Sequence, residues 1–346
     1  MKTKINMSSN MSSNMSAAAI AGLTVGVLTV GSLTLGTASA KTLLMATDRT
    51  GTLYYATGSA LSKVLTTKSG HRVVVRAFGG PDSYIHGMNR GEYDFTAVSS
   101  NSAWFNYNGK TRSKKKTRDL RLVRSGGGAL KLGFLVYNDS DIKTVAQVRG
   151  RKVVSDFGGH AAVGPIVTAA LGSAGLTWKD VQPVKVTGVF DAPKALGAGR
   201  VDVAWGPIGM PAIREIHAKK KVRFLSFQNT PEALALFRKR VFPGVRLTTM
   251  PPIKHLGLQS KTTLLTSDSY LLTHKNIDKK VLNDVLEAMW DNEKEIQKSH
   301  FSLRGFSNKN AATDLPVMPY HPAAIAFYKK KGVWTKEIAA KHGMIK

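Results

Sequence analysis

Short apolar runs alternate with segments of helical spacing along the first third of the chain. Residues 42–46 and 72–77 are apolar runs of strand length, and apolar positions recur at helical intervals over 54–68 between them. A third run, 94–98, follows another short helical segment. This order of strands and helices predicts an α/β fold with a parallel sheet and right-handed crossovers.

A second alternation begins with the long apolar run at 132–138. It predicts another α/β unit with helices between its strands, and the strands are expected at 151–155, 183–187, 201–205 and 222–227. The chain therefore predicts two units of similar construction.

The last part of the chain is expected to return to the first unit. Residues 243–263 are rich in proline and predict irregular structure, and a strand at 267–274 would cross back. One face of 278–300 is apolar, which is typical of a long amphipathic helix. The predicted lobes are 41–132 with 268–346 for lobe one, and 133–267 for lobe two.

The stretch TDRTGTLYY, which begins at Thr47, joins the first predicted strand to the first helix. The free N–H groups and the dipole of a helix start attract anions. The hydroxyls of Thr47, Thr50 and Thr52 would add donors, and Arg49 would add a positive charge. The alternative is an ordinary turn in which Gly51 takes a positive φ and Thr52 caps the helix.

Two further turns carry polar residues at predicted strand ends. Ser99, Ser100 and Asn101 follow the third strand, where side chains of a parallel sheet point into a ligand crevice. Helix capping by Ser100 or Ser102 is the alternative. The second unit repeats the device with the turn Gly158-Gly159-His160, so the two turns are expected to face each other across a cleft. A capping or surface role for His160 is the alternative there.

Composition adds an export signal and a strong positive charge. Residues 1–40 contain no acid, carry a mild apolar run and end in Ala-Ser-Ala, which predicts a secretory signal peptide cut after Ala40. The formal charge is +28, and loss of this segment removes two lysines and no acid, leaving +26. The chain has no cysteine, so disulfides and thiolate chemistry are excluded. The dense basic run 110–118 is expected to be a solvated loop.

Several segments, in the right order, resemble the TAXI family of solute-binding proteins, the extracytoplasmic receptors of TRAP transporters. The family's opening motif is roughly ATGGTGGTYYPIG, which this chain keeps at Ala46, Thr47, Thr50, Gly51, Tyr54, Tyr55 and Gly58. The further matches are GEYDFTAVSSN (91–101), VYNDSDIKTVAQVRGRKV (136–153), VDVAWGPIGMPAIREI (201–216) and MPYHPAAIAFYKKKGVW (318–334). The resemblance implies a two-lobed, type II-like periplasmic binding protein. Each lobe would be a mixed, mostly parallel sheet flanked by helices, with the ligand cleft between the lobes.

The chain departs from the motif at Asp48, Arg49, Thr52 and Leu53, and it has Gly158-Gly159-His160-Ala161 where the family has a GSGT turn. These changes predict a ligand that has a different anionic head group from the family's glutamate and dicarboxylates, or that is a larger acid. The residues expected to bind the ligand are Thr47, Asp48, Arg49, Thr50, Gly51, Thr52, Tyr54, Ser99, Ser100, Asn101, Gly158, Gly159, His160, Trp205 and Pro207.

The expected function is a periplasmic receptor that closes by hinge bending on a small organic anion, such as glutamate or 2-oxoglutarate. As the resemblance implies, it would deliver this solute to an ion-gradient-driven TRAP permease. We expect a monomer without cofactor or metal that does not bind nucleic acid. The sequence contains no GxSxG, HExxH or paired-carboxylate motif that would indicate an enzyme. The alternatives are a sensing receptor with a signalling partner and a basic protein that binds polyanions or surfaces.

Overall fold

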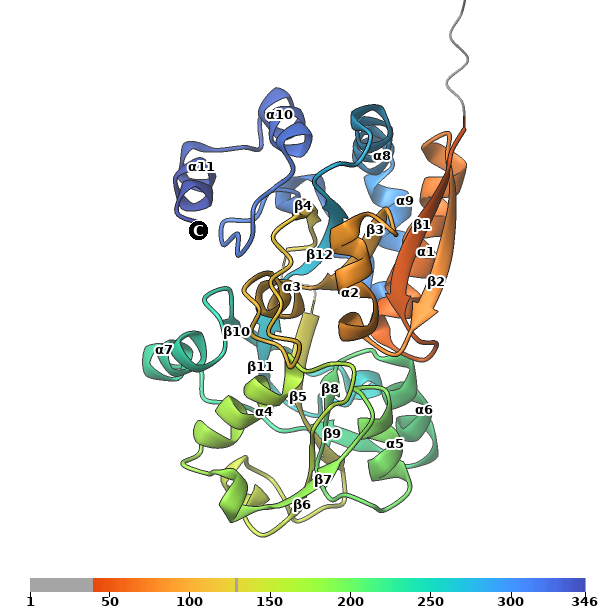
Figure 1. Ribbon diagram of the computed structural model, residues 1–346. Helices are drawn as coiled ribbons and strands as arrows, with labels where there is room; N and C mark the ends of the chain where they lie inside the picture. The colour runs from red at the N-terminus through yellow and green to blue at the C-terminus, as the bar shows by residue number, and fades with distance from the viewer. Residues whose placement is uncertain (1–39, 128–129, 346) are drawn as a thin grey trace, which may run out of the picture. The chain divides into compact units, whose positions relative to one another are not determined.

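The first strand–turn–helix junction is present as β1 (Thr42–Asp48) and α1 (Leu53–Lys68), and it begins a five-stranded sheet (Figure 1). The computed structural model describes residues 40–127 and 130–345; the expected signal peptide therefore lies outside the described residues except for Ala40. β1 pairs in parallel with β2 and β3, whereas β12 is antiparallel to β3 and β4. The order is β2 (Arg72–Phe78), β1, β3 (Phe95–Ser99), β12 (Ser269–His274) and β4 (Leu120–Ser125).

The second sheet differs from the mostly parallel arrangement expected of each lobe. Its described pairs are all antiparallel, and they join β10 (Arg246–Met250), β11 (Thr262–Ser267), β5 (Leu130–Tyr137), β8 (Ala204–Pro207) and β9 (Val222–Phe224). Antiparallel neighbours such as β10 and β11 need only a short connection, without a crossover helix. Parallel pairing in this part is found between β6 (Lys152–Ser155) and β7 (Gln182–Lys185), and at the bridge of Val153 with Val203.

Helices follow many of the strands. They are α2 (Pro81–Arg90), α3 (Ser100–Tyr107), α4 (Val163–Gly172), α5 (Asp191–Gly197), α6 (Pro211–Lys219), α7 (Pro231–Arg240), α8 (Lys279–Asp291), α9 (Glu293–Ser299), α10 (Pro322–Lys330) and α11 (Lys336–Gly343). Single 3₁₀ turns lie at Ala146–Val148, Trp178–Asp180, Lys254–Leu256, Phe301–Leu303 and Asn308–Asn310. α8 and α9 pack beside α1 (Figure 1).

Two expectations for the later part of the chain were wrong. Residues 243–263 are not irregular throughout, because they contain β10 and the start of β11. The helix expected at 278–300 is broken at Asn292, whose amide Nδ2 donates to the carbonyl oxygen of Ala288 at 2.9 Å. The local bond of this side chain competes with continued helix.

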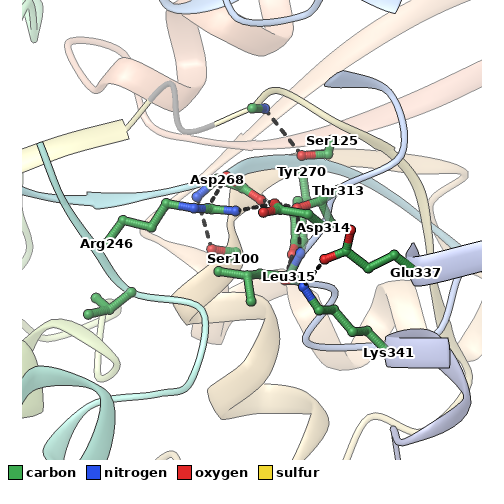
Figure 2. Close-up of polar contacts among 12 residues, drawn as sticks. Ser100, Ser125, Arg246, Asp268, Tyr270, Thr313, Asp314, Leu315, Glu337 and Lys341 are labelled. Carbon is green, nitrogen blue, oxygen red and sulfur yellow. Dashed lines mark hydrogen bonds and ion pairs between the residues drawn. The ribbon is translucent and has the colours of Figure 1, made fainter. Parts of the chain in front are cut away.

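A polar cluster holds the point where the chain passes from the second sheet back to the first (Figure 2). Asp268, which is 2% exposed, lies between β11 and β12. Its carboxylate accepts hydrogen bonds from Arg246 Nη1 at 2.9 Å and from Thr313 Oγ1 at 2.8 Å. Its backbone carbonyl oxygen accepts a hydrogen bond from the N–H of Ser100 at 2.8 Å. Arg246 also binds Asp314 at 2.6 Å. The carboxylate of Asp268 therefore ties the crossover to β10 and the C-terminal segment, and its backbone carbonyl ties the crossover to α3.

The lobe boundaries expected from the sequence remain a prediction. The strands of the first sheet come from 42–125 and 269–274, and those of the second come from 130–267. Residues Ala40–Lys346 group as one unit by their contacts. Within it, no helix of the described ranges is both long and apolar enough to cross a membrane.

Gly58 tests the packing of α1 on β1. A Cβ at Gly58 would lie 2.3 Å from Thr47 Cγ2, so the strand and helix approach too closely for alanine. We expect Gly58→Ala to lower the free energy of unfolding by about 1–3 kcal/mol, the usual cost of overpacking. Urea denaturation measures the change.

The matched control is Gly343→Ala in α11, where an added Cβ meets no atom within 4 Å. Alanine there should leave stability unchanged or raise it by up to about 1 kcal/mol. An equal loss of stability in both variants would contradict the proposed close approach.

Candidate functional site

Five helices present their N-terminal ends to one small cavity between the two sheets. α1, α2, α3, α4 and α6 each contribute an N-cap or first-turn residue to its wall. The cavity is about 40 Å³, room for only a few water molecules. Its lining is Asp48, Thr52, Leu53, Tyr54, Pro81, Val98, Ser99, Asn101, Ser102, Leu130, Leu132, His160, Val163, Ile166, Val189, Pro207 and Met210. Helix N-termini make the potential in this cleft positive.

Asp48 and His160 meet across the cleft. Asp48 is the last residue of β1 and is 2% exposed, and His160 lies in the turn between β6 and α4 and is 5% exposed. His160 Nε2 is 3.1 Å from Asp48 Oδ2, and the Tyr84 hydroxyl donates to Asp48 Oδ1 at 3.5 Å. Burial raises the pKa of Tyr84, and the carboxylate of Asp48 raises it further. Among the described residues, His160 Nδ1 has no hydrogen-bond partner.

Arg49 does not line the cavity, and its side chain reaches residues on the other side of the cleft. Its Nη2 lies 2.7 Å from Asp191 Oδ2 and donates to Thr187 Oγ1 at 3.1 Å. The guanidinium carbon is 4.7 Å from the centre of the Phe190 ring. Asp48 and Arg49 therefore bind separate partners beyond the cleft.

Two hydrogen bonds join the first turn of α2 to the turn before α4. The N–H of Asp82 donates to the carbonyl oxygen of Gly159 at 3.2 Å, and the N–H of Ala161 donates to Asp82 Oδ2 at 2.9 Å. Burial raises the pKa of Asp82, although the bond from Ala161 opposes that shift. A Cβ at Gly80 would lie 2.5 Å from the carbonyl oxygen of Gly159, so glycine is needed for this approach.

The opening turn is an N-capped strand–helix junction. Gly51 has a φ of +88°, and a Cβ there would lie 2.1 Å from Phe190 Cε2. Thr52 caps α1 by accepting the N–H of Tyr55 at 3.1 Å. Thr47 is buried and donates to the carbonyl oxygen of Arg76 at 3.3 Å, whereas Thr50 is exposed. Gly51 and Thr52 therefore have the roles that the alternative, an ordinary turn, assigns to them.

The polar residues after β3 divide into structural and cavity-facing groups. Ser99 caps α3 by accepting the N–H of Ser102 at 3.3 Å, so neither Ser100 nor Ser102 is the cap. Ser100 Oγ accepts the N–H of Asp268 at 3.1 Å. Asn101 is 2% exposed, lines the cavity, and its Oδ1 has no hydrogen-bond partner among the described residues.

Tyr54 forms one polar part of the wall. Its hydroxyl lies 3.0 Å from Ser269 Oγ, so it connects α1 to β12. Burial raises the pKa of this phenol. Tyr54 is therefore neutral and can offer or accept a hydrogen bond inside the cleft.

The structure gathers about half of the expected binding residues around the cavity. Asp48, Thr52, Tyr54, Ser99, Asn101, His160 and Pro207 line it. Thr47, Arg49, Thr50, Gly51, Ser100, Gly158, Gly159 and Trp205 do not. Trp205 is fully buried against Phe134, with ring centres 5.0 Å apart, and Gly158 has a φ of +52° and packs on the backbone of Thr187.

Sequence reasoning missed the apolar wall. Leu130 and Leu132 come from β5, and Val163, Ile166 and Met210 come from helix N-termini of the second unit. Their only sequence signal is position near a strand end or a helix start, and core residues share it. The lining contains no lysine or arginine.

The basic run 110–118 is a largely exposed loop, as expected. Lys110 lies over Trp104 at 4.6 Å from the ring centre, Arg118 lies over Tyr107 at 4.3 Å, and Arg112 pairs with Asp156. Within 40–127 and 130–345, no group of three histidine or acidic side chains has a geometry that suits a metal ion.

Comparison with known proteins places this geometry in a family. The model of a family described as "NMT1-like family" matches residues 45–332. A comparison with curated proteins gives no match. Among solved structures, one described as a periplasmic transporter has a TM-score of 0.55 at 13% identity, covering 88% of this chain and 95% of that one. A binding protein component of an ABC phosphonate transporter from Pseudomonas aeruginosa has a TM-score of 0.50 at 12% identity, covering 88% and 94%. At these identities the similarity shows the fold, the two-lobed α/β architecture of periplasmic binding proteins.

Gly80 tests the contact across the cleft. A Cβ there would meet Gly159 and the His160 ring at 2.5 and 2.6 Å, so Gly80→Ala should separate the two turns. We expect hydrogen exchange at the amides of Asp82 and Ala161 to become about tenfold faster or more, because overpacking costs about 1–3 kcal/mol. Exchange measured by mass spectrometry or NMR checks this, with Gly343→Ala as the control. Unchanged protection at both amides would show that the close approach is absent in solution.

Proposed function

Because this chain belongs to the NMT1-like family, we propose that it is an extracytoplasmic receptor that captures a small organic solute between two lobes. The observation that carries the proposal is the convergence of five helix N-termini on one cleft closed by contacts across it. Binding clefts of two-lobed receptors open and close by hinge motion. The cavity of about 40 Å³ is far below the roughly 300–1,000 Å³ of ligand pockets, so the solute would enter an opened form.

The contacts across the cleft support a receptor over a hydrolase. Histidine and aspartate are paired as in a serine hydrolase, but such a mechanism needs a nucleophile on the other ring nitrogen. His160 Nδ1 instead faces backbone, since Cβ atoms built on Gly80 and Gly188 would lie 2.7 and 3.1 Å from it. We therefore propose that the pair joins the two lobes and performs no chemistry.

A narrower proposal concerns where the protein is located and which membrane permease it docks on. The resemblance noted in the sequence implies a periplasmic protein that docks on a TRAP permease, whereas the phosphonate-binding protein of similar fold is described as part of an ABC transporter. A membrane permease is common to both. Copurification of the native complex from membranes distinguishes the two partners by the presence or absence of an ATPase subunit.

The ligand class also has a narrower form, a small organic anion such as a mono- or dicarboxylate. The helix N-termini favour an anion in the cleft. Against this, Arg49 is engaged with Asp191, and no lysine or arginine lines the cavity. The receptor function therefore does not depend on whether the solute is an anion.

Release of the bound solute tests the receptor function. We expect native mass spectrometry of the purified protein to show a small molecule that is lost on denaturation. Added back at about a hundredfold excess over its Kd, it should raise the free energy of unfolding by about 2.7 kcal/mol. The matched control is the Gly80→Ala protein, which should bind the same solute more weakly because its turns cannot close. Absence of any copurifying or stabilising small molecule would refute the receptor function.

A further inference from the structure

The wall of the cavity contains one acidic side chain, and this side chain is buried. Asp48 is the only carboxylate in the lining, and no lysine or arginine is present there. The nearest arginine by sequence, Arg49, binds Asp191 and lies over Phe190. A carboxylate that is 2% exposed needs compensation for its lost hydration. The surrounding helix N-termini, the Tyr84 hydroxyl and His160 supply it.

We infer that Asp48 itself is the anion that these helix N-termini stabilise, so that the solute is a largely apolar molecule with an amine or other N–H donor. This inference rests on the proposed receptor function and names its substrate class. A second carboxylate beside Asp48 would face a like charge where water is excluded. A donor faces two acceptors, the Asp48 carboxylate and the Asn101 Oδ1 that has no partner among the described residues.

His160 indicates how the donor is accommodated. Asp48 comes from β1 and His160 comes from the turn after β6, so they lie on opposite sides of the cleft. Opening the cleft withdraws the imidazole from Asp48 and leaves the carboxylate facing the entering solute. The N–H of the solute then takes the position next to Asp48 that His160 Nε2 holds here, 3.1 Å from Oδ2.

The apolar wall defines the rest of the solute. Leu53, Val98, Leu132, Ile166 and Met210 come from both sides of the cleft and present aliphatic surface. Burying an apolar body against them provides binding energy that has no charge requirement. A compact aliphatic or aromatic amine matches both features, whereas a dicarboxylate matches neither.

Matched pairs of probes test the inference. Benzylamine and phenylacetate share one body and differ in the charge of the head, as do isobutylamine and isovalerate. Phenylacetamide and isovaleramide are their neutral N–H donors. We expect calorimetry or thermal shift to show the amine or the amide of a pair binding at least about tenfold more tightly than its carboxylate, about 1.4 kcal/mol.

Two isosteric variants separate the role of Asp48 from a general effect of charge. Asp48→Asn should reduce the preference for the amine over the carboxylate about tenfold or more. Asp191→Asn also removes one negative charge and one contact across the cleft, but Asp191 does not line the cavity, so the preference should be unchanged. Circular dichroism and melting without ligand confirm that both variants fold.

The outcomes are distinct. Equal or tighter binding of phenylacetate or isovalerate by the unmodified protein would overturn the inference and leave the receptor function intact. An equal change of preference in both variants would also overturn it. If no probe binds and no solute copurifies, the receptor function itself is wrong.

Discussion

The contact between Asp48 and His160 places an ionisable pair at the centre of a cleft from which water is almost excluded. A buried carboxylate is tolerated only where dipoles and hydrogen bonds replace its hydration. Here the chain topology provides that environment, because the turns after the strands of the first sheet lead into helices that start at the cleft. The same arrangement that suits a bound anion therefore suits an anion built into the protein.

Several other contacts across the cleft are polar. Arg49 pairs with Asp191, and Asp82 bonds to the backbone of Gly159 and Ala161, where Gly80 allows a close approach. Polar contacts of this kind exchange with water at small net cost, whereas apolar interfaces do not. The polar cluster at Asp268 ties the crossover between the sheets to β10 and to the C-terminal segment.

Local patterns predicted local structure well. The alternation of strands and helices, the positive φ of Gly51 and the capping by Thr52 all follow from short-range chemistry. The partners of Asp48 and Arg49 are 112 and 142 residues away, so no periodicity reports them. β10 was missed because prolines flank it, and α7 because Phe237 is its only buried residue. The apolar wall has the same sequence signature as ordinary core.

The position of β12 has a consequence for how the protein is made. This strand lies between β3 and β4, yet it comes from residues 269–274, long after both neighbours. During synthesis the first sheet therefore lacks one of its interior strands until most of the chain has left the ribosome. Neither β3 nor β4 can pair with β12 before then, and the early segments present open strand edges in the meantime. A chain with this topology is suited to being kept unfolded by a chaperone and to folding only after its synthesis is complete.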